Sequence, residues 1–225
     1  MTTDYKFTGS GMTSERVRNR LVEQLRDLGI INEDVLWAIS TIPRHIFVPK
    51  ALQSRAYENI ALPIGHGQTI SQPYIVALMT QLLLAETQRP LEKVLEIGTG
   101  CGYQTAVLAG LCDHIYSIER IAELMWDARN RLYDLKIKNT SFDIADGYNG
   151  WPENAPFDGI LAAAASAEVP EKLLEQLSPG GRLVMPVGDD ENQILKVITR
   201  NNNNFIEQNI TSVRFVAFRR GVKKQ

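Results

Sequence analysis

The chain has 225 residues, of which 44% are hydrophobic and 22% charged, and its formal net charge is −2. This composition is typical of a globular protein, and the near-neutral charge argues against a nucleic-acid-binding face, which needs clustered positive charge. No apolar run approaches the roughly 18 residues that span a bilayer, and residues 1–12 lack the apolar core of a secretory signal, so we expect a cytoplasmic protein without membrane contact.

Residues 1–72 are predicted to form a helical region on the substrate side of the fold. Apolar residues recur at helical spacing over 13–28 and Gly29 follows as a stop, which predicts a first helix. Asn32 can cap a short second helix through its side-chain oxygen. Proline is favoured at the first helical position, so a third, largely buried helix is expected to begin near Pro73.

Residues 73–192 alternate between strand-like and helix-like segments. Strands are predicted at KVLEIG, HIYSIE, TSFDIAD, FDGILAAAA and RLVMPVG. Helices are predicted at YQTAVLAGL, IAELMWDARNRLYDL and PEKLLEQL, with a turn at SPGG. Such alternation requires crossover connections and predicts an α/β fold with a doubly wound, mostly parallel, Rossmann-like sheet covered on both faces.

The last part of the chain, residues 193–225, is predicted to close the sheet. QILKVIT and SVRFVAF flank the turn-rich RNNNNF, which suggests a C-terminal antiparallel pair of strands. The VRFV segment, residues 213–216, is either a structural sheet edge or a strand that pairs with an extended peptide. The basic RRGVKK that follows is interpreted as a solvated tail. We expect residues 1–225 to form a single domain, and nothing in them indicates an obligate partner.

The glycine-rich VLEIGTGCGY follows the first strand of the alternating region. Gly98 and Gly100 flank Thr99, and a turn without side chains lets a ligand approach the backbone, although a turn needed only for packing is the alternative. A nicotinamide-binding turn would carry its third glycine one position later than Gly102. Glu96 precedes the glycines and disfavours a pyrophosphate, whereas it is compatible with the sulfonium and ammonium of S-adenosylmethionine. We therefore expect methyl transfer, with S-adenosyl-L-homocysteine as the product.

Two more acids fall at strand ends on the same edge of the predicted sheet. Glu119 lies 21 residues beyond Gly98, the position from which a carboxylate reaches ribose hydroxyls. Asp146, followed by Gly147, ends the third strand, where it can accept a hydrogen bond from an adenine amine. Together with Glu96, these residues predict an adenosine-containing cofactor.

The cysteine and histidine content indicates neither a disulfide framework nor a metal site. The chain has two cysteines, Cys101 and Cys112, and three histidines, without the spacing of zinc ligands. No metal is expected.

Six segments resemble, in order and spacing, the protein-L-isoaspartate O-methyltransferases. They are ALPIGHGQTISQPY, VLEIGTGCGYQTAVLA, ADG, PFDGILAAAA, VPEKLLEQLSPGGRLVMPVG and VRFV, and the match runs over about residues 14–218. GQTIS and LSPGGRLVMPVG are specific to this family. The resemblance implies a class I methyltransferase that uses S-adenosylmethionine to methylate the free α-carboxylate of isoaspartyl residues in proteins and peptides, which permits repair through a succinimide.

This chemistry needs no general base, because a carboxylic acid with a pKa of roughly 3.5 is already ionised at neutral pH. A lysine or arginine clamp would weaken the nucleophile, so neutral donors are expected to hold it. The hydroxyls of Thr69 and Ser71 and the start of the next helix supply such donors. The resemblance implies that Ser71 is the catalytic residue, and the hydroxyls of both residues are expected to bind substrate. Packing beside the turn is the alternative for Thr69. Helix capping is the alternative for Ser71.

Two other functions stay open on the sequence. A methyltransferase acting on a nucleobase or small molecule is one, although AAAAS lacks the Asn-Pro-Pro-Tyr type of segment found in adenine N-methyltransferases. A catalytically silent module that binds the cofactor and an altered peptide is the other. Retention of Ser71 and Glu119 is necessary for an enzyme but does not prove turnover.

Overall fold

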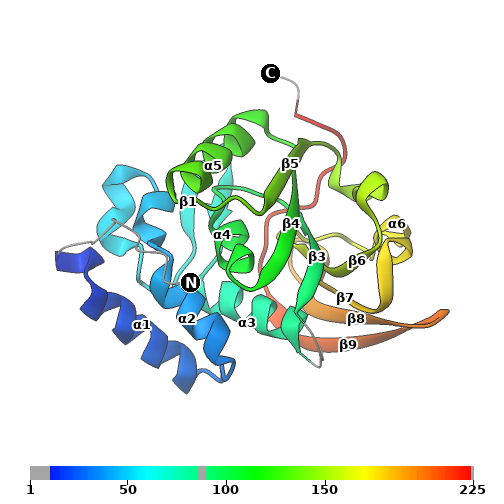
Figure 1. Ribbon diagram of the computed structural model, residues 1–225, viewed down its shortest axis with the longest axis horizontal. Coiled ribbons are helices and arrows are strands. Elements are labelled where there is room, and N and C mark those ends of the chain that lie inside the picture. The colour runs from blue at the N-terminus through cyan, green and yellow to red at the C-terminus, as the bar shows by residue number, and fades with distance from the viewer. Residues whose placement is uncertain (1–10, 86–89, 224–225) are drawn as a thin grey trace.

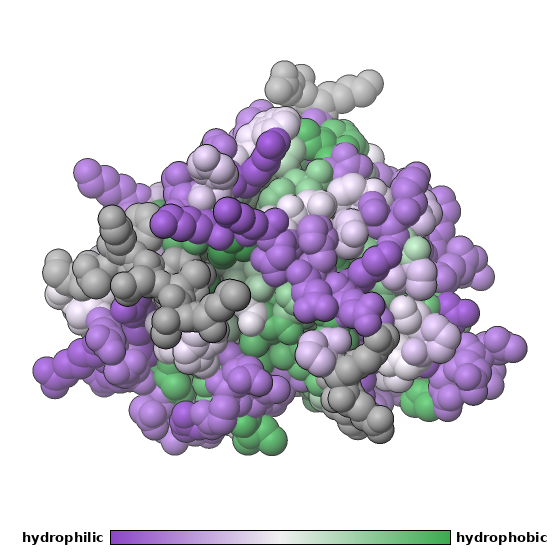
Figure 2. Space-filling model, in the orientation of Figure 1, coloured by the Kyte–Doolittle hydropathy of each residue, from purple (hydrophilic) through white to green (hydrophobic). Residues whose placement is uncertain are grey.

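The computed structural model describes residues 11–85 and 90–223. Residues 1–10, where a secretory signal is not expected, lie outside the described part, as does Lys224 of the predicted tail. Within the described part, no helix has the length and apolar character needed to cross a membrane. Charged and polar residues cover most of the face shown in Figure 2.

Three helices precede the main sheet, as predicted. They are α1 (Glu15–Asp27), α2 (Glu33–Thr41) and α3 (Pro73–Leu84). A 3-10 turn at Gly11–Thr13 precedes α1, and two more, at Arg44–Phe47 and Lys50–Arg55, lie between α2 and α3. The predicted cap is confirmed, because Oδ1 of Asn32 accepts the backbone N–H of Val35 over 3.1 Å. Pro73 stands at the first position of α3, also as predicted. Figure 1 shows α1 and α2 together on the side of the molecule away from the C-terminal strands.

A β-hairpin that the sequence analysis did not predict leads into α3. It pairs β1 (Leu62–Gly65) with β2 (Gln68–Ile70) through a two-residue turn at His66 and Gly67. The turn residues have φ of 54° and 71°, the left-handed conformations that match a tight hairpin turn to the twist of its strands. The hairpin therefore fixes the direction in which the chain enters α3.

Seven strands form the main sheet in the order β5-β4-β3-β6-β7-β8-β9. Neighbours from β5 to β7 are parallel, and β8 and β9 add antiparallel pairs, so the mostly parallel α/β sheet is confirmed. The strands are β3 (Leu91–Ile97), β4 (Cys112–Glu119), β5 (Thr140–Ile144), β6 (Phe157–Ala162), β7 (Leu177–Gly188), β8 (Gln193–Asn201) and β9 (Asn204–Val213), with crossover helices α4 (Tyr103–Ala109), α5 (Ala122–Asp134) and α6 (Glu171–Glu175).

Side chains along the strands alternate between two cores. Val94 and Leu161 belong to the larger core, which also contains buried residues of α1, α2, α3 and α4. Their neighbours Leu95 and Ile160 belong to a smaller core, which contains Leu173 of α6. Both faces of the central strands are thus covered, as their continuous apolar character predicts.

Two local predictions near the C-terminus are wrong. SPGG is not a turn but part of β7, where the register with β6 shifts between Phe157 and Gly159 as in a bulge. The last strand is not SVRFVAF. It runs over Asn204–Val213 and ends where VRFV begins, because the asparagine-rich turn needs only two residues between β8 and β9.

The RRGVKK segment is not a solvated tail over its described residues. The N–H of Gly221 donates to Oδ2 of Asp146 over 2.8 Å, and the N–H of Lys223 donates to the carbonyl of Arg120 over 2.9 Å. The guanidinium of Arg220 lies 4.2 Å from the ring centre of Tyr148. These contacts dock the segment against the carboxyl ends of β4 and β5.

Candidate active site

A cavity of about 780 Å³ opens at the carboxyl ends of the parallel strands. It lies at β3, where the strand order changes direction: the next strand in the chain, β4, pairs with one edge of β3, and the later β6 pairs with the other. Open α/β sheets bind ligands at such a switch point, and the volume suits a small-molecule ligand. Three parts of the chain surround the cavity: the hairpin corner, the strand ends and a C-terminal segment.

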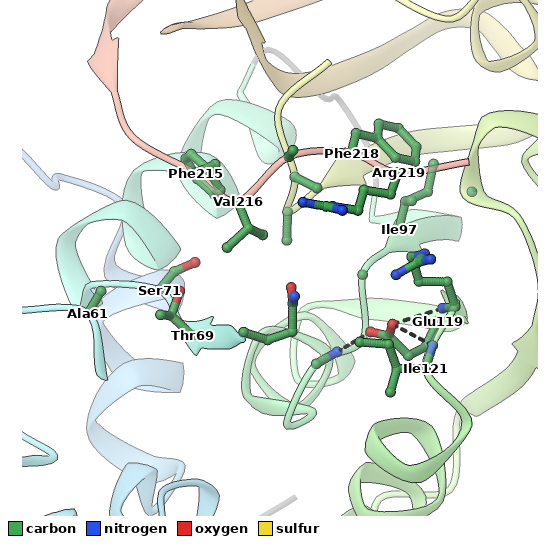
Figure 3. Close-up of a pocket in the computed structure, with 18 of the residues that line it drawn as sticks. Ala61, Thr69, Ser71, Ile97, Glu119, Ile121, Phe215, Val216, Phe218 and Arg219 are labelled. Carbon is green, nitrogen blue, oxygen red and sulfur yellow. Dashed lines mark hydrogen bonds between the residues drawn. The ribbon is translucent and has the colours of Figure 1, made fainter. Parts of the chain in front are cut away.

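The first wall is the hairpin corner, which we define as residues 68–73. Gln68, Thr69, Ser71 and Gln72 line the cavity there. Figure 3 shows Thr69 and Ser71 side by side on this wall. The cap residue of α3 is Gln72, and no side chain caps the helix, so Ser71 does not perform the capping role that was its alternative. Its hydroxyl remains available to a ligand in the cavity.

The glycine turn forms the adjoining wall. Gly98 and Gly100 line the cavity and have φ of 93° and 54°, conformations that glycine adopts without strain. A Cβ on Gly100 would lie 3.5 Å from Cδ1 of Ile64, so the turn packs directly against the hairpin. The fold thereby brings the predicted cofactor turn and the predicted substrate corner to one cavity.

Glu119 lines the cavity opposite the hairpin corner (Figure 3). Its Oε2 accepts the N–H of Gly100 over 2.9 Å, and its Oε1 accepts the N–H groups of Arg120 and Ile121 over 2.8 and 3.0 Å. These three bonds fix the carboxylate. A carboxylate has about four lone-pair sites, so one site remains on Oε2 for a ribose hydroxyl.

Glu96 does not line the cavity. It is fully buried, and its Oε2 accepts the hydroxyls of Thr105 and Ser117 over 2.5 Å each. Burial raises the pKa of Glu96 to about 7, although the two hydroxyl bonds oppose the rise. Thr99 is also buried and shares a 2.6 Å hydrogen bond with Ser117. Glu96 and Thr99 thus support the glycine turn from behind.

Asp146 and Gly147 also differ in whether they line the cavity. Gly147 lines the cavity, whereas both carboxylate oxygens of Asp146 accept backbone N–H groups, from Tyr148 over 3.0 Å and from Gly221 over 2.8 Å. A Cβ on Gly147 would come within 2.8 Å of Cε2 of Phe218. The C-terminal segment therefore occupies the side of this loop at which an adenine was expected.

Residues 212–219 form the roof of the cavity, which was not predicted from the sequence. Figure 3 shows Val216 and Arg219 of this segment above the space between Ser71 and Glu119. Ala165 ties the roof to the end of β6 by accepting the N–H of Phe218 over 2.7 Å and donating to the carbonyl of Val216 over 2.9 Å. VRFV was singled out in the sequence, but only as a sheet edge or added strand.

The charges around the cavity are unevenly placed. The hairpin corner is uncharged, as expected, but Arg120, Arg214 and Arg219 also line the cavity. Glu119 is the single acid among the described lining residues, which include no histidine, cysteine or lysine. Apart from Glu119, whose oxygens accept three backbone N–H groups, these lining residues offer no ordinary side chain for removing a proton, and the site suits a nucleophile that arrives ionised.

No three His, Cys, Asp or Glu side chains of residues 11–85 and 90–223 lie together as a metal site would require. The two cysteines are free and buried.

Comparison with known proteins gives a consistent result. The model of the protein-L-isoaspartate(D-aspartate) O-methyltransferase family matches residues 15–223. The chain is 57% identical to a protein-L-isoaspartate O-methyltransferase of Alcanivorax borkumensis over 97% of this chain and 99% of that protein. It is 53% identical to one of Pseudomonas aeruginosa, over 93% and 99% of the two chains. A Plasmodium falciparum structure named for the same activity, in complex with S-adenosyl-L-homocysteine, has a TM-score of 0.78 at 26% identity, with 90% and 98% of the chains covered.

Proposed function

Because the chain belongs to the protein-L-isoaspartate(D-aspartate) O-methyltransferase family, we propose that its cavity binds S-adenosylmethionine at the glycine turn and an isoaspartyl carboxylate at the hairpin corner. The protein is a methyltransferase that depends on this cofactor. Its substrates are proteins and peptides that contain L-isoaspartyl residues, and the acceptor is the free α-carboxylate. The cytoplasm is the proposed compartment, which the two free cysteines support.

The residues of the cavity fit the cofactor. Glu119 faces the cavity with acceptor capacity for a ribose hydroxyl, and Gly98 and Gly100 leave space for close approach. Gly147 is assigned to the adenine end, and Asp146, whose two oxygens each accept one N–H, keeps acceptor capacity for the adenine amine. When bound, S-adenosylmethionine supplies an electrophilic methyl group on a positively charged sulfur.

The hairpin corner is assigned to the acceptor. Ser71 and Thr69 donate hydrogen bonds to the isoaspartyl carboxylate and orient one oxygen toward the methyl group. The methyl moves to that oxygen, the bond to sulfur breaks, and the carboxylate and sulfonium charges disappear together. Orientation of this kind can contribute about 7 to 11 kcal/mol to catalysis. The methyl ester carries methoxide, a better leaving group than the oxide of a carboxylate, so a neighbouring backbone nitrogen can attack the ester carbonyl and close a succinimide with release of methanol.

One observation carries the proposal: the hairpin packs against the glycine turn, and the hairpin corner and this turn line the same cavity. The test offers radiolabelled cofactor to two peptides that differ only in an Asp or an isoAsp linkage. Label should enter the isoAsp peptide alone and should be released in mild base, as from an ester. Equal labelling of both peptides would contradict the substrate assignment, and no labelling of either would favour the silent binding module.

A further inference from the structure

Arg44 is a buried arginine with an unusual set of partners. It is 0% exposed, and no ion pair of its guanidinium is found among the residues that the structure describes. A buried charge ordinarily needs a partner of opposite charge, because it loses its hydration. The partners of Arg44 are instead backbone carbonyls and an aromatic ring. Arg44 does not itself line the cavity.

The edge of the guanidinium holds the hairpin corner. Nη2 of Arg44 donates to the carbonyl of Ser71 over 2.8 Å, and Nε donates to the carbonyl of Ala56 over 2.8 Å. Asn59 holds the other end of the corner, because its Oδ1 accepts the N–H of Tyr74 over 2.9 Å. The main chain of the corner is therefore fixed on both sides of Pro73, and Arg44 supplies the bond nearest the Ser71 hydroxyl.

The guanidinium of Arg44 also contacts the other half of the site. Its central carbon lies 4.8 Å from the ring centre of Tyr103, which directly follows Gly102 and begins α4. The ring of Tyr103 is itself buried and packs edge-on against Phe47 at 5.4 Å. Since a guanidinium is planar and rigid, it binds the Ser71 carbonyl and the Tyr103 ring in a fixed mutual orientation, which a lysine ammonium cannot do.

We propose that Arg44 is a positioning residue that sets the placement of Ser71 relative to the glycine turn. This inference rests on the proposed function, in which Ser71 orients the acceptor and the glycine turn holds the methyl donor. Arg44 acts through the carbonyl of Ser71 and the ring of Tyr103, without touching either reactant. Methyl transfer depends on the alignment of donor and acceptor, so a small displacement of the corner slows transfer more than it weakens binding.

The test compares Arg44→Lys with a matched control, Arg182→Lys. Arg182 is also buried and also donates to a backbone carbonyl, that of Leu82 over 2.9 Å, but it does not line the cavity. Each variant is measured for kcat and KM on an isoAsp peptide and, by calorimetry, for affinity toward S-adenosyl-L-homocysteine. Arg44→Lys should lose about tenfold to 100-fold in kcat while its affinity for the product stays within about threefold of wild type. A kcat equal to that of Arg182→Lys, or an equal loss of product affinity, would overturn the proposal.

A second variant tests the same proposal if Arg44→Lys does not fold. Replacement of Gln72 by its α-hydroxy acid turns the carbonyl of Ser71 into an ester carbonyl, a weaker acceptor, and leaves every side chain in place. The expected result is a kcat reduced about threefold to tenfold with unchanged product affinity. An unaltered kcat in this variant would count against the role of Arg44.

Amide hydrogen exchange separates this inference from the proposed function. Loss of the bond to Ser71 should speed exchange in the segment that contains Tyr74, relative to Arg182→Lys, whether or not the peptide is methylated. Failure of wild-type protein to label the isoAsp peptide would refute the proposed substrate alone. Unchanged exchange around Tyr74 would refute the positioning role alone.

Discussion

The N–H of Gly100 donates a 2.9 Å hydrogen bond to Oε2 of Glu119, which joins the turn after β3 to the end of β4. This bond places Glu119, the acid among the described lining residues, beside the glycine turn, where a ligand can approach the backbone closely. The same carboxylate also accepts two N–H groups of the following turn. Glu119 therefore shapes the cofactor end of the cavity as well as offering oxygens to a ligand.

Glu119→Gln should weaken binding of S-adenosyl-L-homocysteine. The amide keeps one acceptor oxygen, but its NH2 group would face either the N–H of Gly100 or those of the turn at Arg120. Loss of hydrogen bonds to a charged acceptor is expected to reduce affinity by about tenfold to 100-fold, measured by calorimetry. Glu123→Gln, an exposed change in the first turn of α5, is the control and should bind like wild type. Equal affinities of the two variants would remove Glu119 from the cofactor site.

Ser71→Ala should lower methyl transfer while cofactor binding survives. The hydroxyl donates to an ionised acceptor in the proposed complex, and such a bond is worth about 1.5 to 3 kcal/mol, or roughly tenfold to 100-fold in kcat/KM. Ser40→Ala is the control, because the Ser40 hydroxyl only donates to the carbonyl of Trp37 at the end of α2. Turnover by Ser71→Ala at the rate of the control would exclude the assigned role.

Gly102→Ala should destabilise the fold. Gly102 has a φ of 88°, and a Cβ there would lie 2.7 Å from Cδ1 of Leu132 in α5. Left-handed strain and overpacking together should lower the free energy of unfolding by about 2 to 5 kcal/mol, measured by urea titration. Gly180→Ala separates the two causes, since Gly180 has a φ of 80° but open space around it, and it should cost only about 1 to 2 kcal/mol. Equal losses would show that packing against α5 contributes nothing.

The stability of the protein should depend on the protonation of Glu96. Burial raises the pKa of its carboxyl to about 7, so the folded protein holds a proton that the unfolded chain has already lost. Stability linked to this proton is present below the unfolded pKa, about 4.3, and is lost as pH rises to about 7. Relative to Glu96→Gln, the wild-type free energy of unfolding should fall by up to about 3 kcal/mol between pH 5 and 8. A difference between the two proteins that does not vary with pH would contradict this assignment.

Much of the fold follows from the periodicity of the sequence. The alternating region predicts β3 to β6 and their crossover helices because each strand is apolar and each helix has helical spacing. The hairpin at residues 62–70 was missed, since its strands are short and its turn depends on left-handed His66 and Gly67. The composition of SPGG predicts a turn, yet the segment belongs to β7 and contains a bulge, which only the pairing with β6 determines.

The site could be predicted in part. Spacing relative to the strand ends located Gly98 and Glu119, because parallel strands end at one edge. Spacing did not distinguish residues that line the cavity from those behind it. Glu96, for example, does not line the cavity and instead accepts the hydroxyl of Thr105 in α4. The roof was missed because its position depends on long-range bonds, such as that of Phe218 to Ala165, which leave no local pattern. Arg44 was missed for the same reason.

A crystal structure with S-adenosyl-L-homocysteine and an isoAsp peptide tests the central claim most directly, namely that the hairpin corner and the glycine turn form one site for both reactants. The cofactor sulfur should lie in the cavity between Gly98 and Ser71, with Glu119 on the ribose and the peptide carboxylate bound by the Ser71 hydroxyl. A cofactor bound elsewhere, or a carboxylate held away from residues 68–73, would contradict the account.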